Sequence, residues 1–99
     1  MARRRRFSTE LFGRSVERLM SEQGVTYRGL AERSGLSAGY LNHLVHGNRP
    51  VPSNEVLDRL SESLAVTPEH FREYRLRVVR QRLEATPEFA DRLYGRLST

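Results

Sequence analysis

The stretch that decides the fold runs from Thr26 to Arg49 and reads TYRGLAERSGLSAGYLNHLVHGNR. Two hydroxyls in it, on Thr26 and Ser37, stand where a side chain can cap the start of a helix. Two glycines, Gly35 and Gly47, follow where a left-handed residue can end one. The residues expected to face inward are Leu30, Ala31, Leu41, Leu44 and Val45. The pattern predicts two short helices joined by a tight turn, one running from Thr26 to Gly35 and the other from Ser37 to Gly47.

A longer helix is predicted upstream, over about 9–23, where apolar residues recur at helical spacing. Ser8 or Thr9 is placed to cap its start, and Gly24 is placed to end it. Its expected core stripe is Phe12, Val16, Leu19 and Met20. We therefore expect this helix to pack its apolar stripe against the two short ones.

The residues after the two short helices predict a loop and a fourth helix. Pro50 and Pro52 disfavour helix before each proline, so 48–53 is expected to be a stiff, exposed connection. Ser53 can then cap a helix over about 54–65. The residues expected to face the core are Val56, Leu57, Leu60 and Leu64.

Two further helices are predicted near the C-terminus, because Thr67-Pro68-Glu69 is echoed by Thr86-Pro87-Glu88. Each triplet offers a capping hydroxyl, a proline at the first helical position and an acid at the positive end of the helix dipole. We expect helices over about 68–85 and 87–97. Their expected buried residues are Phe71, Tyr74, Val78, Leu83, Phe89, Leu93 and Leu97, with Arg72, Arg75, Arg77, Arg80 and Arg82 on the solvated side beside Glu69, Glu73 and Glu84.

These segments predict an all-α fold. No segment alternates apolar and polar residues for long enough to suggest a strand. The expected architecture is a compact bundle of about five helices, with a helix-turn-helix at the second and third, and an extra C-terminal helix that makes about six in total. We divide the chain into a basic arm over 1–7, a helix-turn-helix domain over 8–71 and a helical extension over 72–99 that dimerises or caps the core.

Charge and composition narrow the classes of partner. The net charge of +5 favours an anionic partner, which could be DNA, RNA or an anionic membrane. All the cations are arginines, which suits recognition of phosphate and guanine but also follows from a GC-rich genome. The absence of cysteine suits a reducing interior, and neither a signal peptide nor a membrane span is visible. We therefore expect a soluble, cytoplasmic protein that does not bind a membrane.

The ordered spacing of small and apolar residues resembles the helix-turn-helix of phage Cro and lambda-repressor type, the xenobiotic-response-element (XRE) family of bacterial regulators. The matching residues are Leu30, Ala31, Gly35, Leu36, Ser37, Leu41, Leu44 and Gly47, followed by Pro50 and the helix from Ser53. The resemblance covers residues from about 10 to 71. It implies a fold in which the outer face of the second short helix enters the major groove of double-stranded DNA.

The resemblance also implies which residues meet base edges: Ala38, Gly39, Asn42 and His43. Many relatives carry glutamine at the first two of these positions and at the position of Tyr27, and glutamine can read adenine. Ala38 offers only a methyl group and Gly39 only close approach, so hydrogen-bonded base recognition shifts to Asn42 and His43. Expected phosphate contacts that position the protein are Tyr27, Arg28, Ser37, Tyr40, His46, Asn48 and Arg49.

Other interpretations of the same residues remain open. Asn42 and His43 could be ordinary solvated side chains, and Tyr40 could pack against Leu44. His43 and His46 have a spacing that could hold a metal, but no cysteine or adjacent acid completes a site, so we expect neither metal nor cofactor. Arg3, Arg4, Arg5 and Arg6 could form an arm that enters the minor groove, or a nonspecific basic tail.

The function expected from these features is sequence-specific transcription regulation, as a repressor that binds a palindromic operator as a homodimer. The expected dimerisation residues are Val79, Leu83, Phe89, Leu93 and Leu97. The alternative is an antitoxin or other protein-interaction module whose C-terminal helices dock a partner protein. An enzyme is not expected, because no nucleophile, base and orienting group can be placed together.

Overall fold

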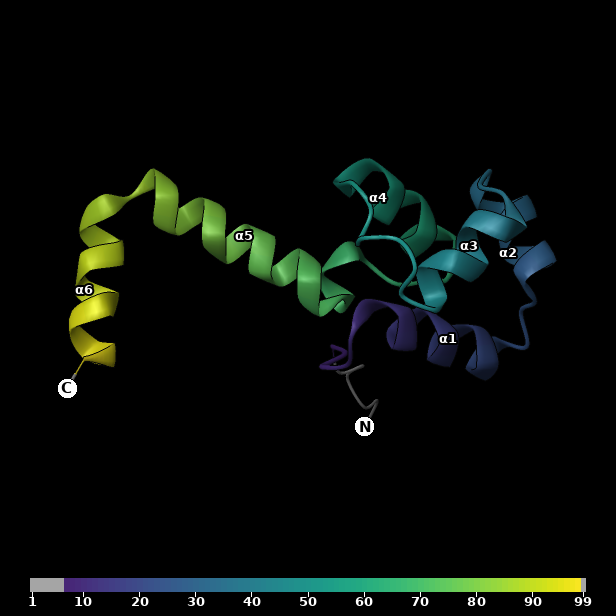
Figure 1. Cartoon of the computed structure of the whole chain (residues 1–99), viewed down its shortest axis with the longest axis horizontal. Helices are drawn as coiled ribbons and strands as arrows, with labels where there is room; N and C mark the ends of the chain where they lie inside the picture. The colour runs from purple at the N-terminus through teal and green to yellow at the C-terminus, as the bar shows by residue number, and fades with distance from the viewer. Residues whose placement is uncertain (1–6, 99) are drawn as a thin grey trace, which may run out of the picture.

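The computed structural model describes residues 7–98, and within them it contains six α-helices, one 3₁₀ turn and no strand (Figure 1). The elements are α1 (Phe12–Gln23), α2 (Tyr27–Ser34), α3 (Ala38–Val45), α4 (Asn54–Ser63), η1 (Pro68–His70), α5 (Arg72–Ala85) and α6 (Pro87–Leu97). The all-α class and the helix-turn-helix at α2 and α3 are confirmed. None of these helices is both long and apolar enough to cross a bilayer.

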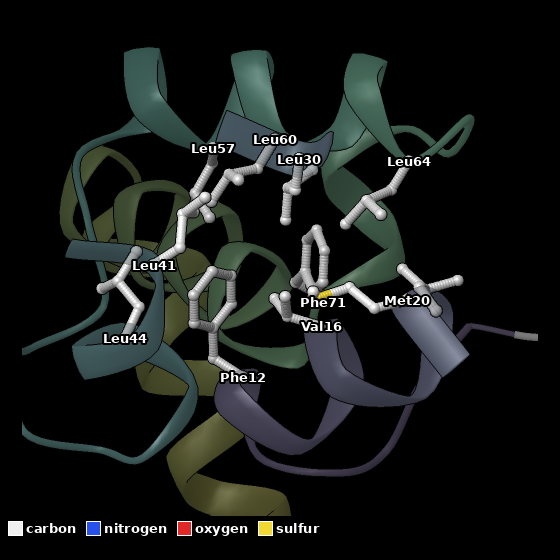
Figure 2. Close-up of a cluster of buried hydrophobic side chains, with 11 residues drawn as sticks. Phe12, Val16, Met20, Leu30, Leu41, Leu44, Leu57, Leu60, Leu64 and Phe71 are labelled. Atoms are coloured by element: carbon white, nitrogen blue, oxygen red, sulfur yellow. The ribbon is translucent and has the colours of Figure 1, made fainter. Parts of the chain in front are cut away.

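The hydrophobic core lies between α1, α2, α3 and α4, and it is completed by two residues that follow them, Leu64 at the end of α4 and Phe71 (Figure 2). Phe71 is fully buried, and its ring centroid lies 5.0 Å from that of Phe12. The other buried apolar residues are Val16, Leu19, Met20, Leu30, Leu41, Leu44, Leu57 and Leu60. The core stripes predicted from helical spacing in the first four helices are therefore confirmed.

Three of the predicted helix starts are confirmed by their hydrogen bonds. The hydroxyls of Thr26, Ser37 and Ser53 accept from the backbone N–H three residues later in each case, at 3.0, 3.1 and 3.4 Å. Gly35 and Gly24 adopt the left-handed conformation expected after a helix, with φ of 78° and 66°. Each signal needs only neighbouring residues, which is why the sequence alone reveals it.

The predicted start of α1 is wrong. The helix begins at Phe12 after Leu11, which has no side-chain cap, whereas Ser8 or Thr9 was expected to provide one. The first N–H of the helix, that of Phe12, instead donates to Oε2 of Glu73 at 3.0 Å. A carboxylate from a distant helix thus replaces the local hydroxyl.

The predicted start of the fifth helix is also wrong, because the predicted helix is interrupted at Phe71 and forms a short 3₁₀ turn followed by α5. Pro68 opens only the 3₁₀ turn η1, and Phe71 is extended before α5 begins at Arg72. The extended backbone allows the Phe71 ring to enter the core. Neither Thr67 nor Thr86 caps a helix through its hydroxyl, although α6 spans the predicted residues. The loop before α4 also departs from expectation, because Pro52 is buried rather than exposed.

Helices α5 and α6 extend away from the four-helix core (Figure 1). α6 packs against α5 and lies away from the core. Val78 and Leu97 were expected to be buried, but they are 47% and 76% exposed, and Phe89 is 40% exposed. Leu83 and Leu93 are only partly buried. The monomer therefore leaves an apolar surface on its last two helices without a covering layer.

Candidate nucleic-acid interface

The paired helices α2 and α3 form a rigid unit whose turn is closed by local bonds. After Gly35 reverses the chain, the N–H of Leu36 donates to Oγ of Ser34 at 3.2 Å. Ser34 is buried, and Leu36 is half-buried against the core. The contribution of Ser34 was missed, although a serine placed just before a turn glycine is a recognisable signal for this bond.

The close approach of α1 to α3 depends on Gly13, a residue that helical spacing alone does not single out. A Cβ atom at Gly13 would lie 2.3 Å from the carbonyl oxygen of Val45 and 2.9 Å from its carbonyl carbon. Val45 is the last residue of α3. The absent side chain thus lets α1 support the C-terminal end of α3 directly, while Leu41 and Leu44 anchor α3 in the core (Figure 2).

The opposite side of α3 is open to solvent and carries all four residues expected to meet bases. Ala38, Gly39, Asn42 and His43 are exposed, and an added Cβ at Gly39 would meet nothing within 4 Å. Within residues 7–98, the side chains of Asn42 and His43 make no hydrogen bond or ion pair. The structure therefore brings the four residues together on one exposed helix face, where amide and imidazole groups are available to an external ligand.

His46 lies just after this face, and its ring is oriented by α3 itself. Nδ1 lies 2.8 Å from the backbone carbonyl oxygen of Asn42. A carbonyl oxygen only accepts, so Nδ1 carries the proton and donates. In the neutral ring Nε2 is then an acceptor, and His46 can donate outward to an anion only when the ring is protonated.

The residues expected to contact phosphates come from the start of α2 and from the segment that follows α3. Tyr27 and Arg28 open α2, whereas Asn48 and Arg49 follow α3 in an exposed turn. Burial raises the pKa of the Tyr27 phenol above its ordinary value, and the nearby carboxylate of Glu17 adds to the shift. Tyr27 therefore keeps its proton and can donate a hydrogen bond at neutral pH.

Two other expected positions differ in how accessible they are. Tyr40 is half-buried and packs against the core. Ser37 is exposed, and its Oγ accepts from the N–H of Tyr40, which leaves its own hydroxyl proton free to donate. The arginines expected to form an arm, Arg3, Arg4, Arg5 and Arg6, lie outside the described residues.

The expected dimerisation residues come together on the C-terminal helices. A groove between α5 and α6 is lined by Val78, Val79, Arg82, Leu83, Phe89 and Leu93. Four of the five expected residues are among them, and Leu97 lies exposed one turn beyond Leu93 on α6. The groove is far from α3 in the same chain (Figure 1).

Comparison with known proteins identifies the class of this fold. A family model described as a helix-turn-helix domain matches residues 11–74, which span α1 to the start of α5. The chain belongs to this helix-turn-helix family, and the XRE type expected from its sequence is confirmed. No curated protein sequence matched the chain.

Solved structures of similar regulators give the same answer. One is the crystal structure of SinR, the master regulator for biofilm formation, in complex with DNA. SinR shares 27% sequence identity with this chain, and the match has a TM-score of 0.54 and covers 57% of this chain and 89% of the SinR chain in that structure. The clp gene regulator ClgR from Corynebacterium glutamicum is 29% identical with a TM-score of 0.54, over 79% and 87% of the two chains. The SinR protein/SinI protein complex, at 22% identity and a TM-score of 0.55, covers 90% of this chain and 100% of that chain and shares the fold. This protein therefore has the fold of helix-turn-helix DNA-binding regulators.

Proposed function

We propose that this protein is a sequence-specific transcription regulator that places the exposed face of α3 in the major groove of double-stranded DNA. The observation that carries the proposal is the position of Asn42 and His43, side by side on a helix whose other face is locked into the core. The helix-turn-helix family and the DNA complex of the similar regulator SinR support it. The protein acts by binding and not by catalysis.

Asn42 and His43 on α3 recognise different base edges. The amide of Asn42 can pair with N6 and N7 of adenine, and the imidazole of His43 can donate to a guanine or accept from an amino group. Ala38 and Gly39 are small, so they permit close approach to the groove floor, and Ala38 can touch a thymine methyl group. The preferred operator then differs from those of relatives that have glutamine at these positions.

The phosphate contacts fix the position of the protein on the duplex and do not determine which base sequence it prefers. The N–H groups and side chains at the start of α2, with Tyr27 and Arg28, face the backbone on one side of the groove. Asn48 and Arg49 face it on the other. Because each neutralised phosphate releases counterions, affinity should fall steeply as salt is raised.

The protein works as a homodimer on a palindromic operator, and it represses by occupying the promoter. A single α3 reads too few base pairs to find one site in a genome, whereas two copies read two half-sites. The groove between α5 and α6 is the interface, because it exposes Val79 and Phe89, which are 51% and 40% accessible in the monomer. We place this activity in the cytoplasm.

The groove also supports the alternative function, an antitoxin or adaptor whose C-terminal helices dock a different protein. The same exposed apolar residues would then be covered by the partner. Sedimentation of the purified chain separates the two: a stable dimer at micromolar concentration favours the homodimer, whereas a monomer favours docking of another protein.

The proposed function is tested by selecting duplexes from a random DNA library at physiological salt. We expect a motif of two inverted half-sites to be enriched, with an affinity for the selected site about 10³-fold or more above that for unrelated DNA. Enrichment of no motif above nonspecific binding would remove the proposal of sequence-specific recognition.

A further inference from the structure

The first turns of α5 carry charged side chains that bond to the helix-turn-helix domain instead of facing solvent. Glu73, Arg75 and Arg77 were all expected on the solvated side of α5, and all three are half-buried. The backbone N–H of Phe12 donates to Oε2 of Glu73 at 3.0 Å. Phe12 is followed by Gly13, which lies against the carbonyl of Val45 at the end of α3. Glu73 thus bonds to the residue next to Gly13, whose backbone supports the end of α3.

Arg77 bonds to the segment that follows α3 in the chain. Its Nη1 donates to Oδ1 of Asn54 at 2.7 Å, and its Nη2 donates to the carbonyl oxygen of Val51 at 3.2 Å. Val51 lies in the connection that leaves α3, and Asn54 is the first residue of α4. The guanidinium group therefore bridges the connection and the helix that follows α3.

Arg75 holds α5 from the other side. Residues 73 and 77 are four apart and share a face of the helix, whereas residue 75 lies about 200° around the axis from either. Nη2 of Arg75 donates to the carbonyl oxygen of Ser8 at 2.7 Å, and its Nη1 donates to those of Glu69 and His70 at 2.9 and 3.0 Å. Bonds on both sides resist tilting of α5 in either direction.

Little else fixes the direction of α5. The helix contains no buried residue, and beyond Arg77 its apolar residues Val78 and Val79 are exposed. Phe71 and the half-buried Tyr74 anchor only its beginning. A helix held at one end transmits any tilt there to its far end, which carries the groove with α6 (Figure 1).

We propose that Glu73, Arg75 and Arg77 fix the angle between α5 and α3, and thereby set the spacing of the two half-sites that the dimer accepts. The proposal rests on the proposed function, because it requires dimerisation through α5 and α6 on DNA. The three are positioning residues that touch no base. A change of one base pair moves a half-site by about 3.4 Å and rotates it around the duplex, so a rigid dimer tolerates few spacings.

The angle itself is tested without DNA. Nitroxide labels on Ser21→Cys in α1 and Ala85→Cys at the end of α5 report the distance between the two helices. Both sites are exposed, and the chain has no cysteine of its own that would also be labelled. Labelled chains diluted with unlabelled ones give the distance within one monomer by electron–electron double resonance. We expect a narrow distance distribution that broadens in Arg77→Ala and stays narrow in Arg80→Ala. Arg80→Ala removes the same charge, but among the described residues Arg80 makes only an exposed pairing with Glu84 at 3.7 Å. An unchanged distribution in Arg77→Ala would overturn the proposal.

The spacing is tested with duplexes that carry the selected half-site twice, separated by different numbers of base pairs. In Arg77→Ala we expect the ratio of affinities for the preferred spacing and its neighbour to fall about tenfold, as for one lost charge-assisted bond. The base preferences within each half-site should stay unchanged. An unaltered affinity ratio in Arg77→Ala overturns the proposal. If the unmodified protein selects no half-site motif, the proposed function is refuted, and the distances between the labels still test whether Arg77 fixes the angle. If Arg77→Ala does not fold, Asn54→Ala removes one of its acceptors and should change both readouts in the same direction; no change in either would overturn the proposal.

Discussion

Replacing Gly13 by alanine tests the packing that supports α3. The added Cβ would lie 2.3 Å from the carbonyl oxygen of Val45 and 3.1 Å from that of Leu44. Both obstacles are backbone atoms of α3, which cannot rotate away as a side chain could, so α1 and α3 must separate. Overpacking of this kind costs about 1–3 kcal/mol or more, while alanine in a helix recovers up to about 1 kcal/mol relative to glycine.

The expected net effect of Gly13→Ala is a loss of about 1–2 kcal/mol in the free energy of unfolding. For a domain of this size the melting temperature should fall by roughly 4–16 °C, measured by circular dichroism at 222 nm. Gly39→Ala is the matched control in the same bundle, because a Cβ there meets nothing within 4 Å. The control should be neutral or slightly stabilised. A Gly13→Ala variant as stable as the unmodified protein would refute the close approach of α1 and α3.

Three further predictions concern the cap, the titration of a tyrosine and the dimer. Ser37→Ala removes the cap of α3 and should cost about 1 kcal/mol in chemical denaturation, whereas Ser37→Asp should largely retain it. Because the pKa of Tyr27 is raised by folding, its contribution to stability is present below the ordinary tyrosine pKa and is lost as the pH rises through the raised value. Tyr27→Phe should reduce that alkaline decline in unfolding experiments, and an identical decline would contradict the assignment. Val79→Asp should convert the dimer to a monomer in sedimentation, while Leu11→Asp, which adds the same charge at the exposed leucine just before α1, should not.

The parts of the fold that the sequence predicts correctly depend on neighbours along the chain. The caps at Thr26, Ser37 and Ser53 each bond within three residues, and the buried stripe of α1 follows from helical spacing. The exposed face with Asn42 was predictable for the same reason, because it is the side of α3 opposite its leucines.

The parts that the sequence does not predict depend on pairs far apart in the chain. Glu73 caps α1 from 61 residues away, and no local pattern announces that its carboxylate replaces the hydroxyls of Ser8 or Thr9. The need for Gly13 becomes visible only when α1 lies on α3. Phe71 belongs to the core as predicted, but it lies in an extended segment just before α5. Helical spacing had placed it within the fifth helix.

The central claim, that the exposed face of α3 reads base sequence, is tested most directly by measuring affinity for every single-base variant of the selected operator with Asn42→Ala and with Arg49→Ala. For Asn42→Ala we predict that discrimination at one position of each half-site falls by about 1–3 kcal/mol, while the other positions keep theirs. For Arg49→Ala we predict weaker binding to all variants alike and a shallower dependence on salt. A uniform loss of affinity from Asn42→Ala, with discrimination unchanged at every position, would contradict the claim.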